Sequence, residues 1–359
     1  MTKLVVSVFT LALATGGLGC TEAEEPQPEA LRGTIGPQGG ELVGAKGTSF
    51  DGVRLQIPAG ALATATEIAV VRAESGTALP VTAVRCGPMF ALQPAGLALH
   101  VPASVTLPFD GAVVDEQYRF EDQVKVWVAE GQGWGQRLQT DNASGTVTVE
   151  VDKFSVVAAG VNPPQANERV RFALHPNPAV AKCLARFPDD KNADRQPAVE
   201  VTVVKGDQND GLFLRGRNIR AGLAFDMFLV ETSQLDAQGA VDPAFKNFGQ
   251  AMYVSDLGAS DRGRLNASIR GVFLNENFSF NPNSNQPPLS MFEVGFWFDD
   301  PKGVEACNFD VNKATPFNPK HQAGPMAMIS VPDAKTGLGP LCTQPDTSVV
   351  PAVCLVGAD

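Results

Sequence analysis

Histidine is the residue type best suited to general acid-base chemistry or to binding a transition metal, and this chain of 359 residues has three. His175 and His321 both lie in segments rich in Pro and Asn. If the fold brings them together, they could bind a metal ion with Asp226 or Asp256 and serve a secreted hydrolase or oxidase. A histidine in such a loop commonly satisfies a backbone group instead. Metal-dependent catalysis is therefore our alternative hypothesis, and we expect no cofactor.

Other clusters of polar residues resemble turns or solvated charge more than reactive sites. The run Asp207-Gln208-Asn209-Asp210-Gly211 lacks the donor spacing of an EF-hand and has no Glu at the twelfth position. Asp189-Asp190 and Asp299-Asp300 are adjacent carboxylates, which are ordinarily solvated on loops. The sequence has no G-x-S-x-G elbow, no H-E-x-x-H motif and no phosphate-binding glycine loop with Lys. These patterns predict a protein that is not an enzyme.

The first 19 residues are typical of a secretory signal peptide. Lys3 precedes an apolar segment, residues 4–14, and small residues follow it. This apolar segment is too short to span a bilayer stably. We therefore expect residues 1–19 to direct export and to be removed.

The end of this segment, Gly17-Leu18-Gly19-Cys20, resembles the lipobox of bacterial lipoproteins. The resemblance implies that Cys20 becomes the N-terminal residue and carries lipids. Gly17 stands where a lipobox usually has Leu, so cleavage that leaves Cys20 as a plain thiol is the alternative. Residues 20–30 are acidic and contain Pro, as in a solvated tether. We expect a lipid-anchored protein of the cell envelope, at the outer membrane or the cell surface.

The cysteines of an exported protein meet oxidants, and the second half of this chain has four. They predict two disulfides with three possible connectivities among Cys183, Cys307, Cys342 and Cys354. Cys342 and Cys354 enclose a short loop with Pro, so their pairing is our first choice, and the other connectivities stay open. Cys86 is expected to be an unpaired, buried thiol. Without C-x-x-C pairs or a nearby His, no structural metal is expected.

The composition favours a folded, mainly β protein. The 28 Lys and Arg against 39 Asp and Glu give a net charge of −11, which disfavours binding to phosphates, so we expect no nucleic-acid partner. Apolar residues make up 44% of the chain, as is ordinary for a globular protein. The 35 Gly and 27 Pro suit many short strands joined by turns better than long helices.

Residues 31–160 have the pattern of a β-sandwich. Apolar and polar residues alternate over short segments separated by turn residues, which predicts strands with one buried face. Such strands require a second sheet stacked on the buried face. The predicted strands include residues 53–57, 66–71, 105–107, 124–128 and 147–151.

The same region resembles ZU5 domains, which occur in ankyrins, netrin receptors, tight-junction scaffolds and bacterial surface proteins. The resemblance implies a β-sandwich used for contact with other proteins, without a cofactor. It is carried by Ile35-Gly36-Pro37-Gln38-Gly39-Gly40, Pro58-Ala59-Gly60-Ala61-Leu62, Gly87-Pro88, Phe90-Ala91-Leu92-Gln93-Pro94-Ala95-Gly96, Trp134 and Lys153-Phe154-Ser155.

Lys153-Phe154-Ser155 departs from a known pattern of the ZU5 family. Some ZU5 domains cut themselves at His-Phe-Ser, where the histidine activates the serine that attacks the preceding carbonyl. Lys153 occupies the histidine position here. An ordinary lysine is protonated at neutral pH and cannot accept the serine proton. We therefore expect this degenerate autoproteolysis motif to leave the chain intact.

Residues 161–168 are polar and contain Pro, as in a linker, and a second domain is expected over residues 169–345, with a C-terminal tail over residues 346–359. The second domain is expected to be mostly β and sandwich-like, with long loops at residues 275–288 and 308–325. Its predicted strands are residues 170–174, 198–204, 223–230, 264–270 and 291–298.

Phrases of the second domain such as Val294-Gly295-Phe296-Trp297-Phe298 resemble a secreted bacterial domain without an established activity. That resemblance implies no site. The leading hypothesis is a non-enzymatic, lipid-anchored envelope protein that presents its β domains for binding to an envelope protein or glycan. Its contact with the membrane is expected through the lipid anchor.

Overall fold

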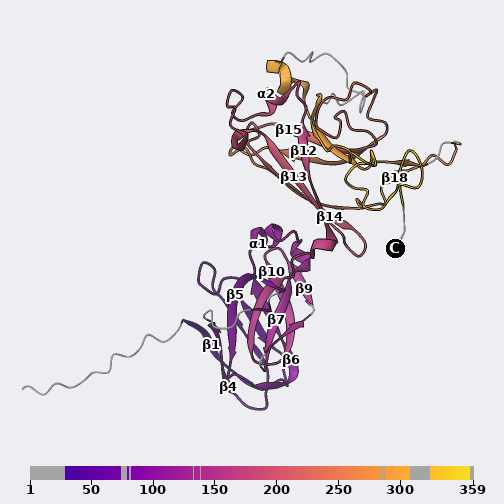
Figure 1. The fold of residues 1–359 in the computed structure, drawn as a ribbon. Helices are drawn as coiled ribbons and strands as arrows, with labels where there is room; N and C mark the ends of the chain where they lie inside the picture. The colour runs from indigo at the N-terminus through magenta and orange to yellow at the C-terminus, as the bar shows by residue number, and fades with distance from the viewer. Residues whose placement is uncertain are drawn as a thin grey trace, which may run out of the picture.

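A computed structural model describes residues 29–73, 79–80, 82–131, 133–137, 139–283, 285, 288–307 and 324–355. The predicted signal peptide, Cys20 and His321 lie outside these residues. The protein is mainly β, which confirms the predicted fold class, and the strands form two bodies that follow one another in the chain (Figure 1). Within the described ranges, no helix is long and apolar enough to cross a membrane.

The first body is a sandwich of two antiparallel sheets. One sheet has the order β1-β4-β5-β11-β7-β8 and the other the order β2-β3-β6-β10-β9. Alternating burial along β3 and β10 turns one face of each strand inward, as the sequence pattern predicts. The strands are β1 (Ala30–Ile35), β2 (Gly40–Val43), β3 (Arg54–Ile57), β4 (Thr66–Arg72), β5 (Val84–Gln93), β6 (Ala98–Pro108), β7 (Lys125–Glu130), β8 (Gly133–Arg137), β9 (Asp141–Ala143), β10 (Thr146–Lys153) and β11 (Val156–Val161).

A short connection between β6 and β7 lies at the end of the sandwich that faces the second body (Figure 1). It contains α1 (Gly111–Glu116) and the 3-10 turn η1 (Glu121–Gln123). The Asp110 side chain caps α1 by accepting a hydrogen bond of 2.9 Å from the backbone N–H of Ala112. Asp115, Tyr118, Phe120 and Asp122 of this connection contact the second domain.

The second domain is built on one eight-stranded antiparallel sheet in the order β16-β15-β20-β21-β12-β13-β14-β17. Its edge strands β16 and β17 are consecutive in the chain and meet at a tight turn, so the sheet is nearly closed and its halves pack against each other. The strands are β12 (Arg169–Pro176), β13 (Ala198–Val204), β14 (Asp210–Arg217), β15 (Ala224–Val230), β16 (Ala251–Gly258), β17 (Leu265–Gly271), β20 (Glu293–Phe298) and β21 (Met326–Ile329).

Shorter elements complete the second domain. Two small two-stranded ladders lie outside the main sheet. One of them joins residues 345–346 to residues 353–354, so all of it except residue 345 belongs to the expected C-terminal tail. The elements are η2 (Ala166–Glu168), α2 (Ala181–Leu184), η3 (Ala193–Arg195), β18 (Phe278–Ser279), β19 (Leu289–Ser290), η4 (Pro301–Cys307), β22 (Pro345–Asp346) and β23 (Val353–Cys354). Of the two expected long loops, residues 308–323 lie outside the described part of the chain.

Strand β20 is buried on both faces. Phe296 and Phe298 point into the main core of the domain, whereas Trp297 belongs to a separate cluster on the outer face. Phe248, from the segment between β15 and β16, covers Trp297 with ring centroids 5.0 Å apart. The main sheet therefore has a core on its inner face and a second apolar layer over part of its outer face.

Two disulfides tie the second domain together. Cys183 of α2 bonds to Cys307 of η4, and Cys342 bonds to Cys354 of β23. This is the connectivity that the short loop between Cys342 and Cys354 favours. Cys86 in the first domain is a buried free thiol.

Candidate functional site

The two domains are joined by ion pairs at the end of the sandwich that carries α1. Asp115 of α1 accepts hydrogen bonds from the Arg215 guanidinium of β14 and from the Ser268 hydroxyl of β17. Asp122 of η1 pairs with Arg270, also in β17. Two carboxylates of the first domain thus bind two adjacent strands of the second.

Aromatic rings pack beside these ion pairs. The ring of Phe120 lies 5.1 Å from that of Phe213, and the Arg270 guanidinium lies 4.2 Å above the Phe120 ring. Gly211 makes this approach possible, because a Cβ at that position would lie 2.9 Å from the Phe120 ring. Contact between the domains therefore has an apolar part as well as an ionic one.

The linker is bound to the first domain by Arg119. Its guanidinium donates a hydrogen bond of 2.7 Å to the Asn162 carbonyl and lies 3.7 Å from the Glu168 carboxylate. Burial lowers the pKa of Arg119, and the charge of Glu168 opposes that change. The chain between the domains is therefore held at both its ends.

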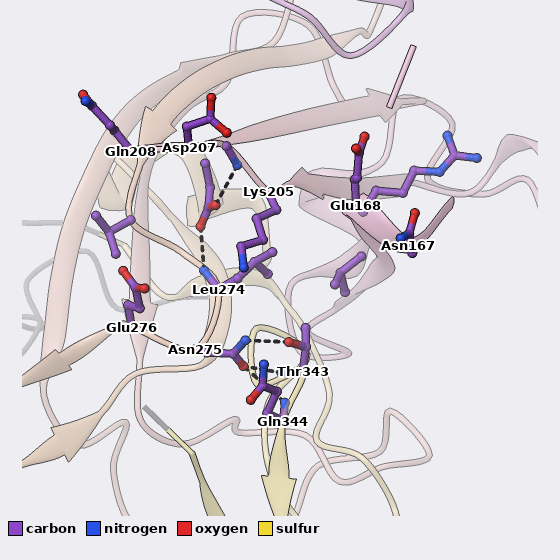
Figure 2. A pocket seen from close by; sticks show the side chains of 15 residues that line it. Asn167, Glu168, Lys205, Asp207, Gln208, Leu274, Asn275, Glu276, Thr343 and Gln344 are labelled. Atoms are coloured by element: carbon purple, nitrogen blue, oxygen red, sulfur yellow. Dashed lines mark hydrogen bonds between the residues drawn. The ribbon is translucent and has the colours of Figure 1, made fainter. Parts of the chain in front are cut away.

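A polar cleft of about 440 Å³ opens in the second domain next to the linker (Figure 2). Four segments form it: the end of the linker with the start of β12, the turn between β13 and β14 with the first residue of β14, the residues after β17, and residues 343–344. The polar side chains in its lining include Asp207, Gln208, Asp210, Asn275, Glu276 and Gln344.

Asp210 and Asn275 hold the segments of the cleft together. The Asp210 carboxylate accepts hydrogen bonds from the backbone N–H groups of Phe273 and Leu274, at 2.9 and 2.8 Å. The Asn275 side chain accepts from the backbone N–H of Thr343 at 2.7 Å and donates to its hydroxyl (Figure 2). Asn275 has a φ of 57°, a conformation that Asn tolerates better than most residues. These polar groups are used to build the cleft.

Other side chains of the cleft remain available to a ligand. Asp207, Gln208 and Glu276 are exposed, and within the described part of the chain their side chains make no hydrogen bond or ion pair. A carboxylate accepts hydrogen bonds, whereas an amide both accepts and donates them. The cleft can therefore bind a polar group that offers several hydroxyl or amide functions.

A second cavity, of about 360 Å³, lies on the other side of the same turn, at the junction of the domains. It shares residues 205–208 with the polar cleft and is also lined by Tyr118, Phe120 and Phe213. Since Tyr118 and Phe120 belong to the first domain, this cavity exists only where the two domains meet.

Of the four residues in the alternative metal hypothesis, His321 lies outside the described part of the chain, and the other three are not brought to one place. Asp226 of β15 and Asp256 of β16 are register partners, but His175 lies on β12, three strands away from Asp226. Because neighbouring strands lie about 4.8 Å apart, β12 and β15 are about 14 Å apart, which is too far for His175 and Asp226 to bind the same ion. Among the described residues, no group of three or more His, Cys, Asp or Glu side chains could hold a metal ion.

The motif Lys153-Phe154-Ser155 lines a cavity of about 480 Å³ in the first domain. Phe154 is 1% exposed, and its carbonyl accepts a hydrogen bond of 2.9 Å from the Gly96 N–H. The Ser155 hydroxyl donates to the Ala129 carbonyl at 2.6 Å, whereas Lys153 is exposed. Ser155 is thus hydrogen-bonded to a carbonyl, which is not a base.

No protein-family model matches the chain, and no curated protein matches it. Of the residues that line the polar cleft and the junction cavity, the sequence indicated only the turn at residues 207–211 as a cluster of polar side chains. The pairs Asp115–Arg215 and Asp122–Arg270 join residues 100 and 148 positions apart and leave no local signal.

Proposed function

We propose that the protein is a lipid-anchored component of the bacterial cell envelope that binds another envelope component, a protein or a glycan, and does not act as an enzyme. The observation that carries this proposal is the junction of the two domains. Ion pairs join the domains, the junction cavity opens between them, and the adjacent polar cleft carries Asp207, Gln208 and Glu276, whose side chains make no hydrogen bond or ion pair with the described residues. A preorganised surface of this kind suits binding.

The disulfides support the location. The bonds Cys183–Cys307 and Cys342–Cys354 indicate an oxidising environment outside the cytoplasm, as for an exported protein. The lipid anchor on Cys20, the tether and the ZU5-like identity of the first domain are parts of the proposal. They rest on the lipobox-like sequence, the acidic segment that follows it and the motifs of residues 31–160.

Metabolic labelling with a clickable fatty acid tests the anchor. We expect the parent protein to incorporate the label and the Cys20→Ser variant to lose it. Label retained by the Cys20→Ser variant contradicts the proposed anchoring.

Capture from envelope extract tests the binding. Three immobilised proteins are compared: residues 30–359 of the parent, an Asp207→Asn/Glu276→Gln variant of the polar cleft, and an Asp189→Asn/Asp261→Asn control. The two carboxylates that the control replaces are exposed and lie outside the polar cleft and the junction cavity. We expect the parent and the control to retain the same envelope component and the cleft variant to lose it. Equal retention by all three proteins would place the binding elsewhere, and no retention would reject the proposed function.

A further inference from the structure

We propose that the polar cleft and the junction cavity together form the binding site for an oligosaccharide that passes over the turn between β13 and β14. The inference rests on the proposed function and names the chemical class of the ligand. It follows from the types of side chain in the cleft, from the arrangement of the two cavities, and from the way in which their walls are held.

The side chains of the cleft match the hydroxyl groups of a sugar. Each hydroxyl both donates and accepts a hydrogen bond, and a sugar ring carries several of them side by side. Asp207 and Glu276 accept, Gln208 and Gln344 can accept and donate, and the Arg169 guanidinium donates, so a ligand with many hydroxyls, each of which donates and accepts, can be satisfied here. A hydrogen bond to a charged carboxylate is stronger than one between neutral groups, which favours ligands that donate.

The arrangement of the cavities favours an extended ligand. The polar cleft and the junction cavity have volumes of about 440 and 360 Å³, each within the range of small-molecule sites. Residues 205–208 belong to the walls of both. A chain of sugar units can therefore occupy both cavities by crossing this turn, whereas a single unit can fill only one.

The walls are fixed before a ligand arrives. Asp210 ties the segment after β17 to the start of β14, and Asn275 ties that segment to Thr343, next to the disulfide Cys342–Cys354. Ion pairs of Asp115 and Asp122 set the position of the first domain, which supplies Tyr118 and Phe120 to the junction cavity. Because the backbone of these walls is already held in place, binding a flexible glycan costs little additional conformational entropy of the protein.

Isothermal titration of the full chain with cellohexaose, chitohexaose and maltohexaose tests the site, with the matching disaccharides as short ligands. We expect at least one hexasaccharide to bind, and its disaccharide to bind at least tenfold more weakly. The Asp207→Asn/Glu276→Gln variant should lose at least tenfold in affinity, whereas the Asp189→Asn/Asp261→Asn control should stay within twofold of the parent. All four carboxylates are exposed, so both variants should keep the parent's melting temperature.

The inference is wrong if none of the hexasaccharides binds, if the cleft variant binds as well as the parent, or if the disaccharide binds equally well. Capture from envelope extract separates these failures from failure of the proposed function. A captured component that protease destroys, together with no binding of the hexasaccharides, would overturn the oligosaccharide site and leave a protein-binding function in place. A hexasaccharide that binds as expected would support the site.

Discussion

Asp115 of the first domain forms an ion pair with Arg215 of the second, although the two residues are 100 positions apart in the chain. The same carboxylate also accepts a hydrogen bond from the Ser268 hydroxyl. One side chain in a six-residue helix thus contacts two strands of the other domain.

Removing this carboxylate should loosen the junction with a small effect on global stability. The side chains of Arg215 and Asp115 are 25% and 39% exposed, so solvent screens their attraction, and we expect Asp115→Ala to lower the free energy of unfolding by about 1 kcal/mol. Proteolysis within residues 161–168 should become several-fold faster, because the linker opens when the domains separate. Urea unfolding and limited proteolysis measure the two effects.

The Glu41→Ala variant provides the matched control for Asp115→Ala. Glu41 pairs with Arg54 on the surface of the first domain, and both side chains are about half exposed. We expect a similar small loss of stability and unchanged cleavage of the linker. Equal acceleration of proteolysis in both variants would show that Asp115 has no special role at the junction.

Glu293 should make the second domain less stable as the pH rises. It is 2% exposed, and burial raises its pKa from 4.5 to about 7, while the hydrogen bond from Ser330 opposes that rise. Between these pH values the folded chain keeps a proton that the unfolded chain releases, so the free energy of unfolding falls by about 3 kcal/mol.

The Glu293→Gln variant isolates the contribution of Glu293. Its amide oxygen can still accept from Ser330, and its side chain does not titrate. Urea unfolding of parent and variant should give similar stabilities at pH 4.5 and a more stable variant at pH 8. A difference that stays constant from pH 4.5 to pH 8 would contradict the raised pKa.

The two disulfides should contribute unequally. They join residues 124 and 12 positions apart, and the longer loop loses more entropy in the unfolded chain. We expect Cys183→Ala/Cys307→Ala to cost about 5 kcal/mol and Cys342→Ala/Cys354→Ala to cost about 3 kcal/mol, measured by urea unfolding. The opposite order would show that the loop length does not set their contributions.

Thiol alkylation of residues 30–359 should modify one cysteine, and only after unfolding. Cys86 is 3% exposed, and burial raises its pKa to about 12, so the native protein should not react at pH 8. Denaturation without a reductant should expose this single thiol to alkylation. Mass analysis that finds more than one modified cysteine would be incompatible with the two disulfides.

The chain should stay intact at Phe154-Ser155. The Ser155 hydroxyl donates to the Ala129 carbonyl, which cannot remove its proton, and Lys153 stands where the proposed ZU5-like identity implies a histidine. Purified protein incubated for days should yield no fragment that begins at Ser155. Parent cleavage that Ser155→Ala abolishes would contradict this prediction, whereas cleavage confined to Lys153→His would show that the missing base alone protects the chain.

Many of the strands could be predicted from the alternation of apolar and polar residues along the sequence. The predicted segment 198–204 coincides with β13, and residues 264–270 differ from β17 by one position at each end. Strand β16 was not predicted, because it is an edge strand with mixed exposure and no apolar alternation. Strand β14 was not predicted either, since its short apolar run, Leu212-Phe213-Leu214, is ambiguous by itself.

The site could be predicted less well. The sequence indicated a turn at residues 207–211, and the turn is there, but its place between two cavities depends on segments far away in the chain. Helix α1 has six residues, too few for a periodic pattern to predict it. The near closure of the second sheet combines the local turn between β16 and β17 with the long-range pairing of β12 with β21, and no local pattern specifies that pairing.

The buried position of Cys86 has a consequence for the order in which the protein matures. An odd thiol beside four cysteines that must pair is a source of wrong disulfides, since a thiolate attacks any disulfide that it can reach. Cys86 lies in β5, in the core of the domain that emerges first during synthesis, and domains generally fold as units in that order. A sandwich that folds before Cys183 and the later cysteines become available encloses this thiol and keeps it away from their pairing, so the succession of the domains along the chain favours the correct disulfides.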